Sequence, residues 1–152
     1  MPIELSPIAV VHNPRPQLGD DDWGKVESRI VLADDMPTEA LDGIDSFSHV
    51  EVIFYFDRVA KEKVVCGARH PRNNPAWPKV GILAQRGKSR PNRIGLTTVR
   101  VLGREGNTLR VLGLDAVDGT PVLDIKPVMA EFLPRGEVVQ PAWSEELMVR
   151  YW

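Results

Sequence analysis

The segment from Phe47 to Phe56 reads FSHVEVIFYF and is the longest stretch of the chain that favours a β-strand. Aromatic and β-branched residues dominate it, and such side chains suit the pleated, half-buried surface of a sheet. The segment therefore predicts a long strand, and the flanking sequence offers several partners for it.

Shorter apolar runs, separated by turn signals, lie on both sides of this segment. We expect further strands over residues 8–11, 29–32, 80–83, 97–102, 109–114 and 122–125. The spacer at 103–107, GREGN, predicts a β-hairpin with a five-residue loop. Residues 37–41 favour one or two helical turns, and 13 prolines and 12 glycines leave no clear amphipathic helix elsewhere. Seven short strands are typical of a barrel or sandwich, so we predict one all-β (mainly β) domain over residues 1–152.

Two segments stand outside this strand pattern. The stretch from Cys66 to Pro78 contains three prolines and predicts an ordered loop. The tail from Pro134 to Trp152 ends in Tyr151 and Trp152, and aromatic side chains at a terminus are costly to leave in water. We therefore expect the tail to dock on this chain or on a second one.

The composition excludes several classes of protein. A hydrophobic content of 43% with 26% charged residues is ordinary for a soluble globular domain and excludes disorder, collagen and coiled coil. No apolar run reaches the ~18 residues of a membrane span. The start, Met1 to Glu4, lacks the features of a signal peptide, and Cys66 is the single cysteine. We expect a cytoplasmic protein without disulfides.

Common catalytic and metal motifs are absent. His12, His49 and His70 are far apart, and Cys66 with His70 lacks a second ligand pair, so we expect no metal site. The chain has no Gly-x-Ser-x-Gly elbow, Walker A loop or Gly-x-Gly-x-x-Gly fingerprint. Ser48 and His49 would point to opposite faces of a strand, which argues against a direct couple between them.

The charge is concentrated in one part of the chain. Between Arg58 and Arg93 lie ten basic residues and one acid, a formal charge of +9, whereas the remaining residues carry −11. The stretch Arg86 to Gly95 alone holds four cations. Cations with free backbone N–H groups suit phosphate, although a solvated loop without a partner would have the same composition. The uneven charge favours an anionic partner, most simply a nucleic acid.

A second informative stretch runs from Leu114 to Pro127 and reads LDAVDGTPVLDIKP. Asp118 and Gly119 are ordinary turn residues. Asp124 and Lys126 lie two residues apart and therefore share one strand face. They indicate either an ion pair or a polar pocket.

Three motifs together resemble the TsaA-like family, which is also called TrmO or VirR. They are GIDSFSH from Gly43, RPNRIGL from Arg90 and the Leu114–Pro127 stretch, and the likeness covers residues 5–130. The resemblance implies a small closed β-barrel with short helical pieces, and a homodimer. It also implies S-adenosylmethionine as cofactor, bound without a Rossmann domain, and N6-methylation of threonylcarbamoyladenosine next to the tRNA anticodon.

The resemblance also implies roles for individual residues. Expected cofactor-binding residues are Trp23, Phe56, Asp57, Arg86, Leu96, Leu114, Asp115, Ala116 and Val117. Expected substrate-binding residues are Arg90, Arg93 and Lys126, and the catalytic candidates are Asn92 and His49. The chain departs from the family where Gly87 replaces a serine, Arg93 a proline, Asp57 a histidine and Val128 an aromatic residue, and Trp23 is carried over by position alone.

Other functions remain open at this point. The chain could methylate another RNA or a small molecule, or it could be a non-catalytic module that binds S-adenosylmethionine or RNA. The basic segment favours an RNA substrate, and the intact Arg90-Pro91-Asn92 motif argues against a non-catalytic role. We expect no extra C-terminal domain of the kind found in longer bacterial members.

Overall fold

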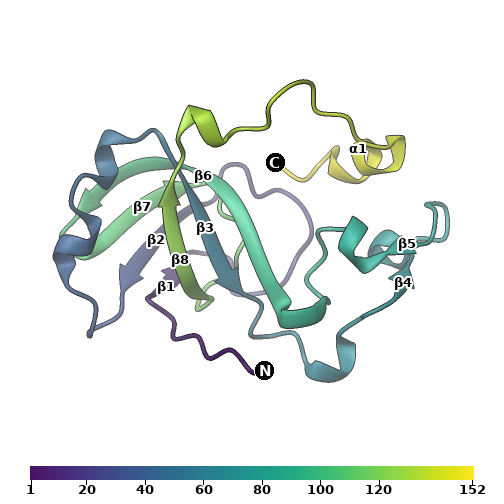
Figure 1. The fold of residues 1–152 in the computed structure, drawn as a ribbon, viewed down its shortest axis with the longest axis horizontal. Coiled ribbons are helices and arrows are strands. Elements are labelled where there is room, and N and C mark those ends of the chain that lie inside the picture. Colours follow the sequence, from purple (N-terminus) through teal and green to yellow (C-terminus); the bar gives the residue numbers. More distant parts are fainter.

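Six antiparallel strands close into a barrel in the computed structural model, which describes residues 1–152 (Figure 1). Their order around the barrel is β1-β2-β7-β6-β3-β8. The bounds are β1 Ala9–His12, β2 Glu27–Leu32, β3 His49–Tyr55, β6 Ile94–Glu105, β7 Thr108–Leu112 and β8 Pro121–Pro127. The predicted closed β-barrel is confirmed.

Alternate residues of most strands fill the barrel interior, whereas β8 contributes Val122 and Ile125 on either side of a bulge. In β3 the side chains of Val50, Val52 and Phe54 are buried, and their neighbours face outward. Gly95 of β6 lies directly over the Phe54 ring, and a Cβ atom there would sit 2.5 Å from ring carbons. The glycine of the RPNRIGL motif is therefore required by close packing, and it fixes the start of β6 against β3.

The hairpin between β6 and β7 has a shorter loop than predicted. Both strands extend beyond the apolar run, so only Gly106 and Asn107 connect them, with Gly106 in the left-handed region at φ 59°. The helical turns expected at 37–41 form the 3-10 helix η1 Thr38–Leu41, followed by η2 Ile44–Ser46.

The argument against a Ser48–His49 couple is wrong. Strand β3 begins at His49, so Ser48 lies outside it and does not follow its alternation. Ser48 Oγ and His49 Nδ1 are 2.7 Å apart, and both residues are exposed.

Residues 58–93 leave the barrel between β3 and β6, and we call them the basic lobe (Figure 1). A two-stranded sheet joins β4 Ala68–Arg69 to β5 Val80–Gly81. The predicted loop from Cys66 to Pro78 thus contains a short strand, and the strand predicted at 80–83 ends after two residues. Four 3-10 helices complete the lobe: η3 Lys61–Lys63, η4 Pro71–Asn73, η5 Ile82–Ala84 and η6 Pro91–Arg93.

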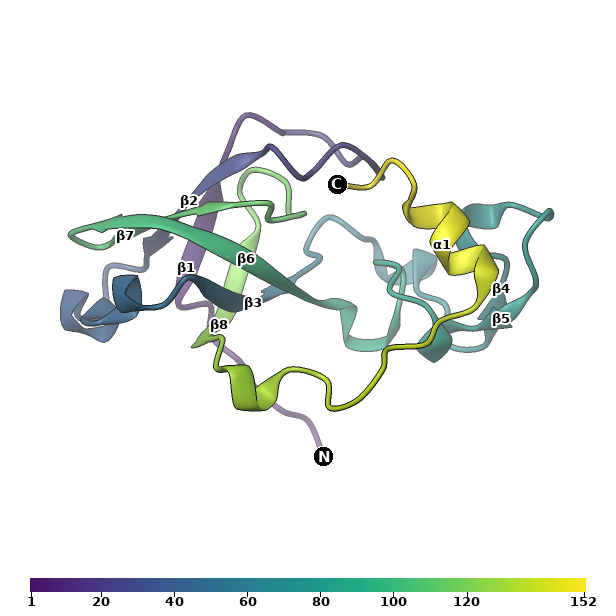
Figure 2. The same cartoon turned by 90° about the horizontal axis from the view of Figure 1, so that it is seen from above.

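The chain after β8 crosses the molecule to reach the basic lobe. It forms η7 Ala130–Phe132, an exposed connection and α1 Ala142–Met148, which lies beside β4 and β5 in both views (Figures 1 and 2). Trp77 Nε1 of the lobe donates a hydrogen bond of 2.8 Å to Glu146 of α1. No helix in the chain has the length and apolar character needed to cross a membrane.

The last three residues return to the barrel. The backbone N–H groups of Asp22 and Trp23 donate hydrogen bonds of 2.9 and 2.8 Å to the carbonyls of Arg150 and Tyr151. The predicted docking of the aromatic tail is confirmed, and it takes place on the same chain.

Candidate functional site

The carboxylate of Asp115 is the centre of a polar cluster between the barrel and the tail. The hydroxyl of Thr97 on β6 donates to Oδ1, and the hydroxyl of Tyr151 donates to Oδ2. We call the group formed by Trp23, Arg86, Thr97, Asp115 and Tyr151 the Asp115 cluster.

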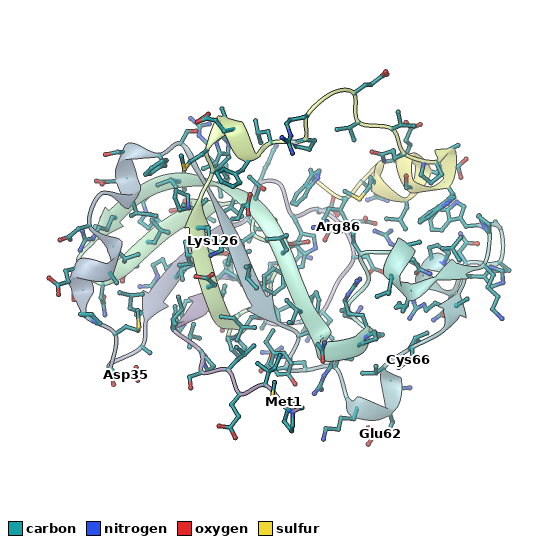
Figure 3. All side chains as sticks on the ribbon, viewed as in Figure 1. Met1, Asp35, Glu62, Cys66, Arg86 and Lys126 are labelled. Carbon is teal, nitrogen blue, oxygen red and sulfur yellow. The ribbon has the colours of Figure 1, made fainter.

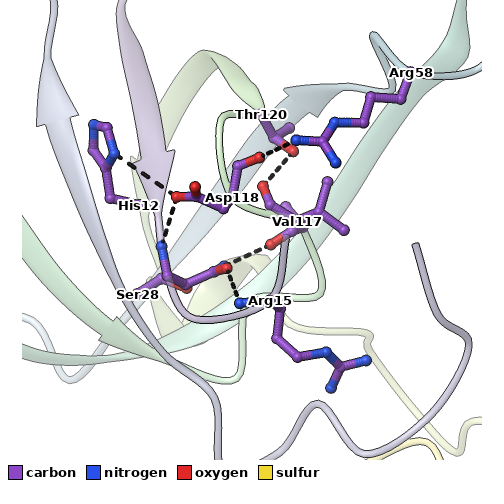
Figure 4. Close-up of polar contacts among 9 residues, drawn as sticks. His12, Arg15, Ser28, Arg58, Val117, Asp118 and Thr120 are labelled. Carbon is purple, nitrogen blue, oxygen red and sulfur yellow. Dashed lines mark hydrogen bonds and ion pairs between the residues drawn. The ribbon is translucent and has the colours of Figure 1, made fainter. Parts of the chain in front are cut away.

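The loop that carries Asp115 is held by hydrogen bonds from Asn13 and Arg58 (Figure 4). The side-chain amide of Asn13 donates to the carbonyl of Ala116 at 2.7 Å, and the Asn13 N–H donates to Asp118 Oδ1 at 3.0 Å. Arg58 donates to the carbonyl of Asp118 at 2.8 Å. A side chain on a loop fixed in this way is pre-organised, so Asp115 needs little rearrangement to bind a ligand.

Arg86 adds a positive charge to the Asp115 cluster. It belongs to the basic lobe and lies on the side of the lobe that faces the barrel (Figure 3). Its side chain donates through Nη2 to the carbonyl of Leu96, which leaves most of its five N–H donors free. Leu96 is 44% exposed, and the alternation along β6 turns its side chain to the face opposite that of Thr97.

Trp23 is the most deeply buried residue of the cluster. Its side chain is 2% exposed, and the guanidinium of Arg15 lies 4.0 Å from the centre of the ring. The indole is therefore a buried support, and its backbone N–H holds the carbonyl of Tyr151.

The surroundings keep the Tyr151 phenol protonated. Burial raises the pKa of Tyr151 well above its ordinary value, and the nearby Asp115 carboxylate raises it further. The positive charges of Arg86 and Arg72 oppose this rise in the pKa. Arg72 itself pairs with Asp21 at 3.0 Å.

Asn92 lies in a turn with unusual backbone geometry. Asn92 and Arg93 are both left-handed, with φ of 61° and 48°, and Asn92 is exposed without a side-chain partner among the hydrogen bonds of the chain. Non-glycine residues rarely adopt this conformation, and such strain is common where a side chain has to be presented to a ligand.

The two arginines beside Asn92 stabilise this turn. Arg90 donates to the carbonyl of Gln85 at 2.6 Å, and Arg93 donates to the carbonyl of Val59. The Arg93 guanidinium also lies 5.0 Å from the centre of the Tyr55 ring. Neither arginine is neutralised by an acid, so both keep their charge available to a partner.

Three of the expected cofactor-binding residues are buried beside Asp115. The side chains of Leu114, Ala116 and Val117 are at most 5% exposed and pack inside the protein. Any ligand contact that they make would involve their backbone atoms, whereas Asp115 between them is accessible.

Phe56 and Asp57 lie beside the Asn92 turn. Phe56 follows β3, and its N–H donates to the carbonyl of Arg93 at 2.8 Å. Its ring packs edge-to-face on Phe54, and Asp57 is exposed. These two residues therefore border the part of the site that contains Asn92.

His49 is far from Asn92. In the β3–β6 ladder His49 pairs with Arg100, whereas Tyr55 pairs with Ile94 at the other end. At ~3.3 Å per residue the two ends lie about 20 Å apart. His49 instead follows Ser48, which lines a surface hollow of about 550 Å³ with Arg100.

Lys126 also lies apart from the Asp115 cluster. It is on the barrel, well away from Arg86 (Figure 3). Its ammonium group lies 2.9 Å from Asp124, and the hydrogen bond with this carboxylate raises the pKa of Lys126. Of the two possibilities for Asp124 and Lys126, the structure therefore has the ion pair.

The positive charge of the basic lobe is not cancelled by acids. Of its ten basic side chains, only Arg72 forms an ion pair with a carboxylate. Arg58, Arg86, Arg90 and Arg93 donate to backbone carbonyls, which satisfies donors without removing charge. The lobe thus has the electrostatic character of an anion-binding surface.

The sequence did not identify two members of the cluster. Thr97 follows the RPNRIGL motif directly, and its position beside Asp115 depends on the barrel register. Tyr151 was expected to dock, but its partner could not be predicted from the sequence.

No group of three or more histidine, cysteine, aspartate or glutamate side chains is arranged to hold a metal ion.

Comparison with known proteins adds three findings. The family model described as the tRNA-methyltransferase O N-terminal domain matches residues 15–132. A probable S-adenosyl-L-methionine-binding protein of Pyrococcus abyssi is 41% identical over 109 residues, which is 72% of this chain and 56% of that protein. The human tRNA (adenine(37)-N6)-methyltransferase is 38% identical over 105 residues, which is 69% of this chain and 23% of that enzyme.

A solved structure agrees with this likeness. The crystal structure of TrmO from Pseudomonas aeruginosa matches with a TM-score of 0.73 and 26% identity, over 94% of this chain and 62% of that one. This chain thus spans about half the length of the Pyrococcus relative and less than a quarter of the human one.

Proposed function

Since the chain belongs to the family of the tRNA-methyltransferase O N-terminal domain, we propose that it is an S-adenosylmethionine-dependent methyltransferase acting on tRNA. The proposed methyl acceptor is N6 of the adenine at position 37, carrying a threonylcarbamoyl group. The observation that carries the proposal is the Asp115 cluster, in which a carboxylate held by two protein hydroxyls lies near the Arg86 cation, whose N–H donors are mostly free.

These groups fit S-adenosylmethionine chemically. Arg86 is suited to the carboxylate of the methionine moiety, because guanidinium and carboxylate form strong charge-assisted hydrogen bonds. Asp115 is suited to sugar hydroxyls as an acceptor. The cofactor, when bound, supplies a methyl group activated by a positively charged sulfonium. Phe56, Asp57 and the 114–117 backbone are proposed to complete this pocket.

The basic lobe is proposed to bind the tRNA. Its uncompensated cations match a phosphate backbone, and releasing counterions from the RNA would drive binding. Arg90 and Arg93 flank the exposed turn at Asn92 and are proposed to contact RNA there. Lys126 is proposed to contact the same RNA from the barrel wall.

Asn92 is proposed to hold the acceptor nitrogen. Its amide has both donors and an acceptor, so it can bind an N6–H group or the carbamoyl oxygen of the modified adenine. Since methyl transfer depends chiefly on alignment of the reacting atoms, a rigid turn that presents this amide would contribute through positioning. His49 lies at the other end of β3 and is given no role in this arrangement.

We also propose that two copies of the chain form a homodimer. Large apolar side chains are exposed around the connection between β8 and α1, including Phe132 at 78% and Val139 at 83%. Apolar groups exposed to this extent commonly mark an interface. Analytical ultracentrifugation should give a dimer, and a Phe132→Ser, Val139→Ser double variant should sediment as a monomer. A wild-type monomer at all concentrations would contradict this proposal.

The proposed activity is tested by transfer of a labelled methyl group from S-adenosylmethionine to bulk tRNA. After digestion, the label should appear in an N6-methylated adenosine, and tRNA lacking the threonylcarbamoyl group should accept much less. Label in another nucleoside or in a small molecule would instead support the alternative substrates. S-adenosylmethionine binding without transfer to any acceptor would support a non-catalytic module.

A further inference from the structure

The C-terminal tripeptide is fitted closely to the barrel. Two backbone hydrogen bonds join Arg150 and Tyr151 to Asp22 and Trp23. Gly24 lies against the backbone of Trp152, and a Cβ atom on Gly24 would be 2.7 Å from the Trp152 carbonyl carbon. The Trp152 ring packs edge-to-face on the Tyr151 ring with centres 4.8 Å apart. The tripeptide therefore holds the Tyr151 phenol in one orientation.

The segment before the tripeptide contributes little to this attachment. Residues 129–142 are exposed, and their hydrogen bonds are made with near neighbours in the sequence. A side-chain hydrogen bond outside the tripeptide connects Glu146 of α1 to Trp77. The position of Tyr151 is thus set by the contacts of the last three residues with residues 22–24, by its own bond to Asp115 and by the attachment of α1 to Trp77.

Tyr151 occupies only part of the hydrogen-bond acceptor capacity of the Asp115 carboxylate. An ionised carboxylate has about four acceptor positions on its two oxygens. Thr97 occupies one position on Oδ1, and Tyr151 occupies one on Oδ2. One further acceptor position remains on each oxygen, and the pair matches two hydroxyl donors on neighbouring atoms.

We infer that Tyr151 is a positioning residue that orients the Asp115 carboxylate toward the vicinal ribose hydroxyls of the adenosyl ligand. The two protein hydroxyls fix the rotation of the carboxylate, so that both ligand hydroxyls meet oriented acceptors. The inference rests on the proposed function, because it requires an adenosyl ligand at Asp115. The family match ends at residue 132, so Tyr151 lies beyond the part of the chain that it describes.

The test compares two ligands and three variants with the wild type by calorimetric titration. The ligands are S-adenosylhomocysteine and its 2′,3′-dideoxyribose analogue. Tyr151→Phe removes the hydroxyl and keeps the ring. Gly24→Ala displaces the tail, and with it the Tyr151 phenol, without replacing any side chain of the cluster, and Gly81→Ala is its control because no atom lies within 4 Å of a Cβ there.

We expect Tyr151→Phe and Gly24→Ala to weaken S-adenosylhomocysteine binding about 5- to 10-fold, the size of one hydrogen bond of this type. The dideoxy analogue should bind the wild type and both variants equally, and Gly81→Ala should match the wild type for both ligands. An equal loss for both ligands would indicate a general structural effect and would overturn the inference.

Two other results would also overturn the inference about Tyr151. Unchanged or tighter binding of S-adenosylhomocysteine by Tyr151→Phe would mean that the hydroxyl is irrelevant or competes with the ligand, while the proposed function would stand. A wild-type protein that binds neither ligand would remove the proposed function and this inference together.

Discussion

The hydroxyl of Tyr151, the penultimate residue, donates a hydrogen bond to the carboxylate of Asp115, which lies 36 residues earlier in the chain. This contact connects a docked tail to a loop that is fixed by Asn13 and Arg58. The candidate site is therefore assembled from the barrel, the basic lobe and the C-terminus, and each part can be tested separately.

Replacing Asp115 by asparagine should weaken S-adenosylmethionine binding about tenfold or more, because hydrogen bonds to a charged acceptor are the stronger class. Asp124→Asn is the matched control, since Asp124 pairs with Lys126 on the barrel wall. The two variants should differ clearly in calorimetric affinity. Equal affinities would remove Asp115 from the ligand site.

Arg86→Ala should also lower the affinity for S-adenosylmethionine, by roughly 10-fold, because it removes a cation suited to the ligand carboxylate. Lys61→Ala removes one charge from an exposed position of the same lobe and should have little effect. The informative comparison uses 5′-methylthioadenosine, which lacks that carboxylate. Arg86→Ala should bind it as the wild type does, and a similar loss for both ligands would count against the assigned role.

Gly95→Ala should destabilise the fold by about 1–3 kcal/mol, because the new methyl group would overlap the Phe54 ring. Chemical denaturation of this variant and of Gly81→Ala measures the difference in the free energy of unfolding. A Gly95→Ala protein as stable as the wild type would show that β3 and β6 need not approach so closely.

Binding of the chain to tRNA should weaken steeply with salt, and the basic lobe should determine the slope. Lys88→Ala should reduce the slope of log K against log salt by nearly one, the amount expected for one phosphate contact. Lys25→Ala, an exposed lysine outside the lobe, should leave the slope unchanged. Equal slopes for both variants would place the RNA elsewhere.

The tail contact predicts an alkaline loss of stability. Burial and Asp115 raise the pKa of Tyr151 above its ordinary value of 10.0, so the protonated phenol stabilises the folded state. This contribution is complete below pH 10.0 and is lost as the pH rises toward the folded pKa. The free energy of unfolding should therefore fall more steeply above this pH in the wild type than in Tyr151→Phe. Identical profiles for the two proteins would argue against the contact.

Much of the barrel could be predicted from the sequence, because the alternation of apolar and polar residues along a strand is a local signal. The β3 segment alternates buried and outward residues, and the hairpin between β6 and β7 shows the same pattern on both sides of a glycine turn. Strands β4 and β5 are two residues long each, and α1 has seven residues. None of these elements is long enough to show a periodic pattern of apolar residues that could be recognised in the sequence.

The candidate site was predictable only in part. Arg86 and Asp115 were identified through motifs, and the structure brings them to neighbouring positions of β6, where Arg86 bonds the Leu96 carbonyl and Thr97 bonds Asp115. The roles of Thr97 and Tyr151 depend on barrel register and on tail docking, which join residues distant in sequence. The Ser48–His49 contact was missed for a local reason, since the strand begins at His49, two residues after the start of the predicted segment at Phe47.

The central claim is that the Asp115 cluster binds S-adenosylmethionine, and calorimetric titration of the purified chain tests it most directly. We predict saturable binding of S-adenosylmethionine and of its demethylated product, with about one ligand per chain, and a large loss of affinity in Asp115→Asn. Absence of heat and of saturation with both ligands would contradict the claim, and the basic lobe would then be an anion-binding surface without a methyl donor beside it.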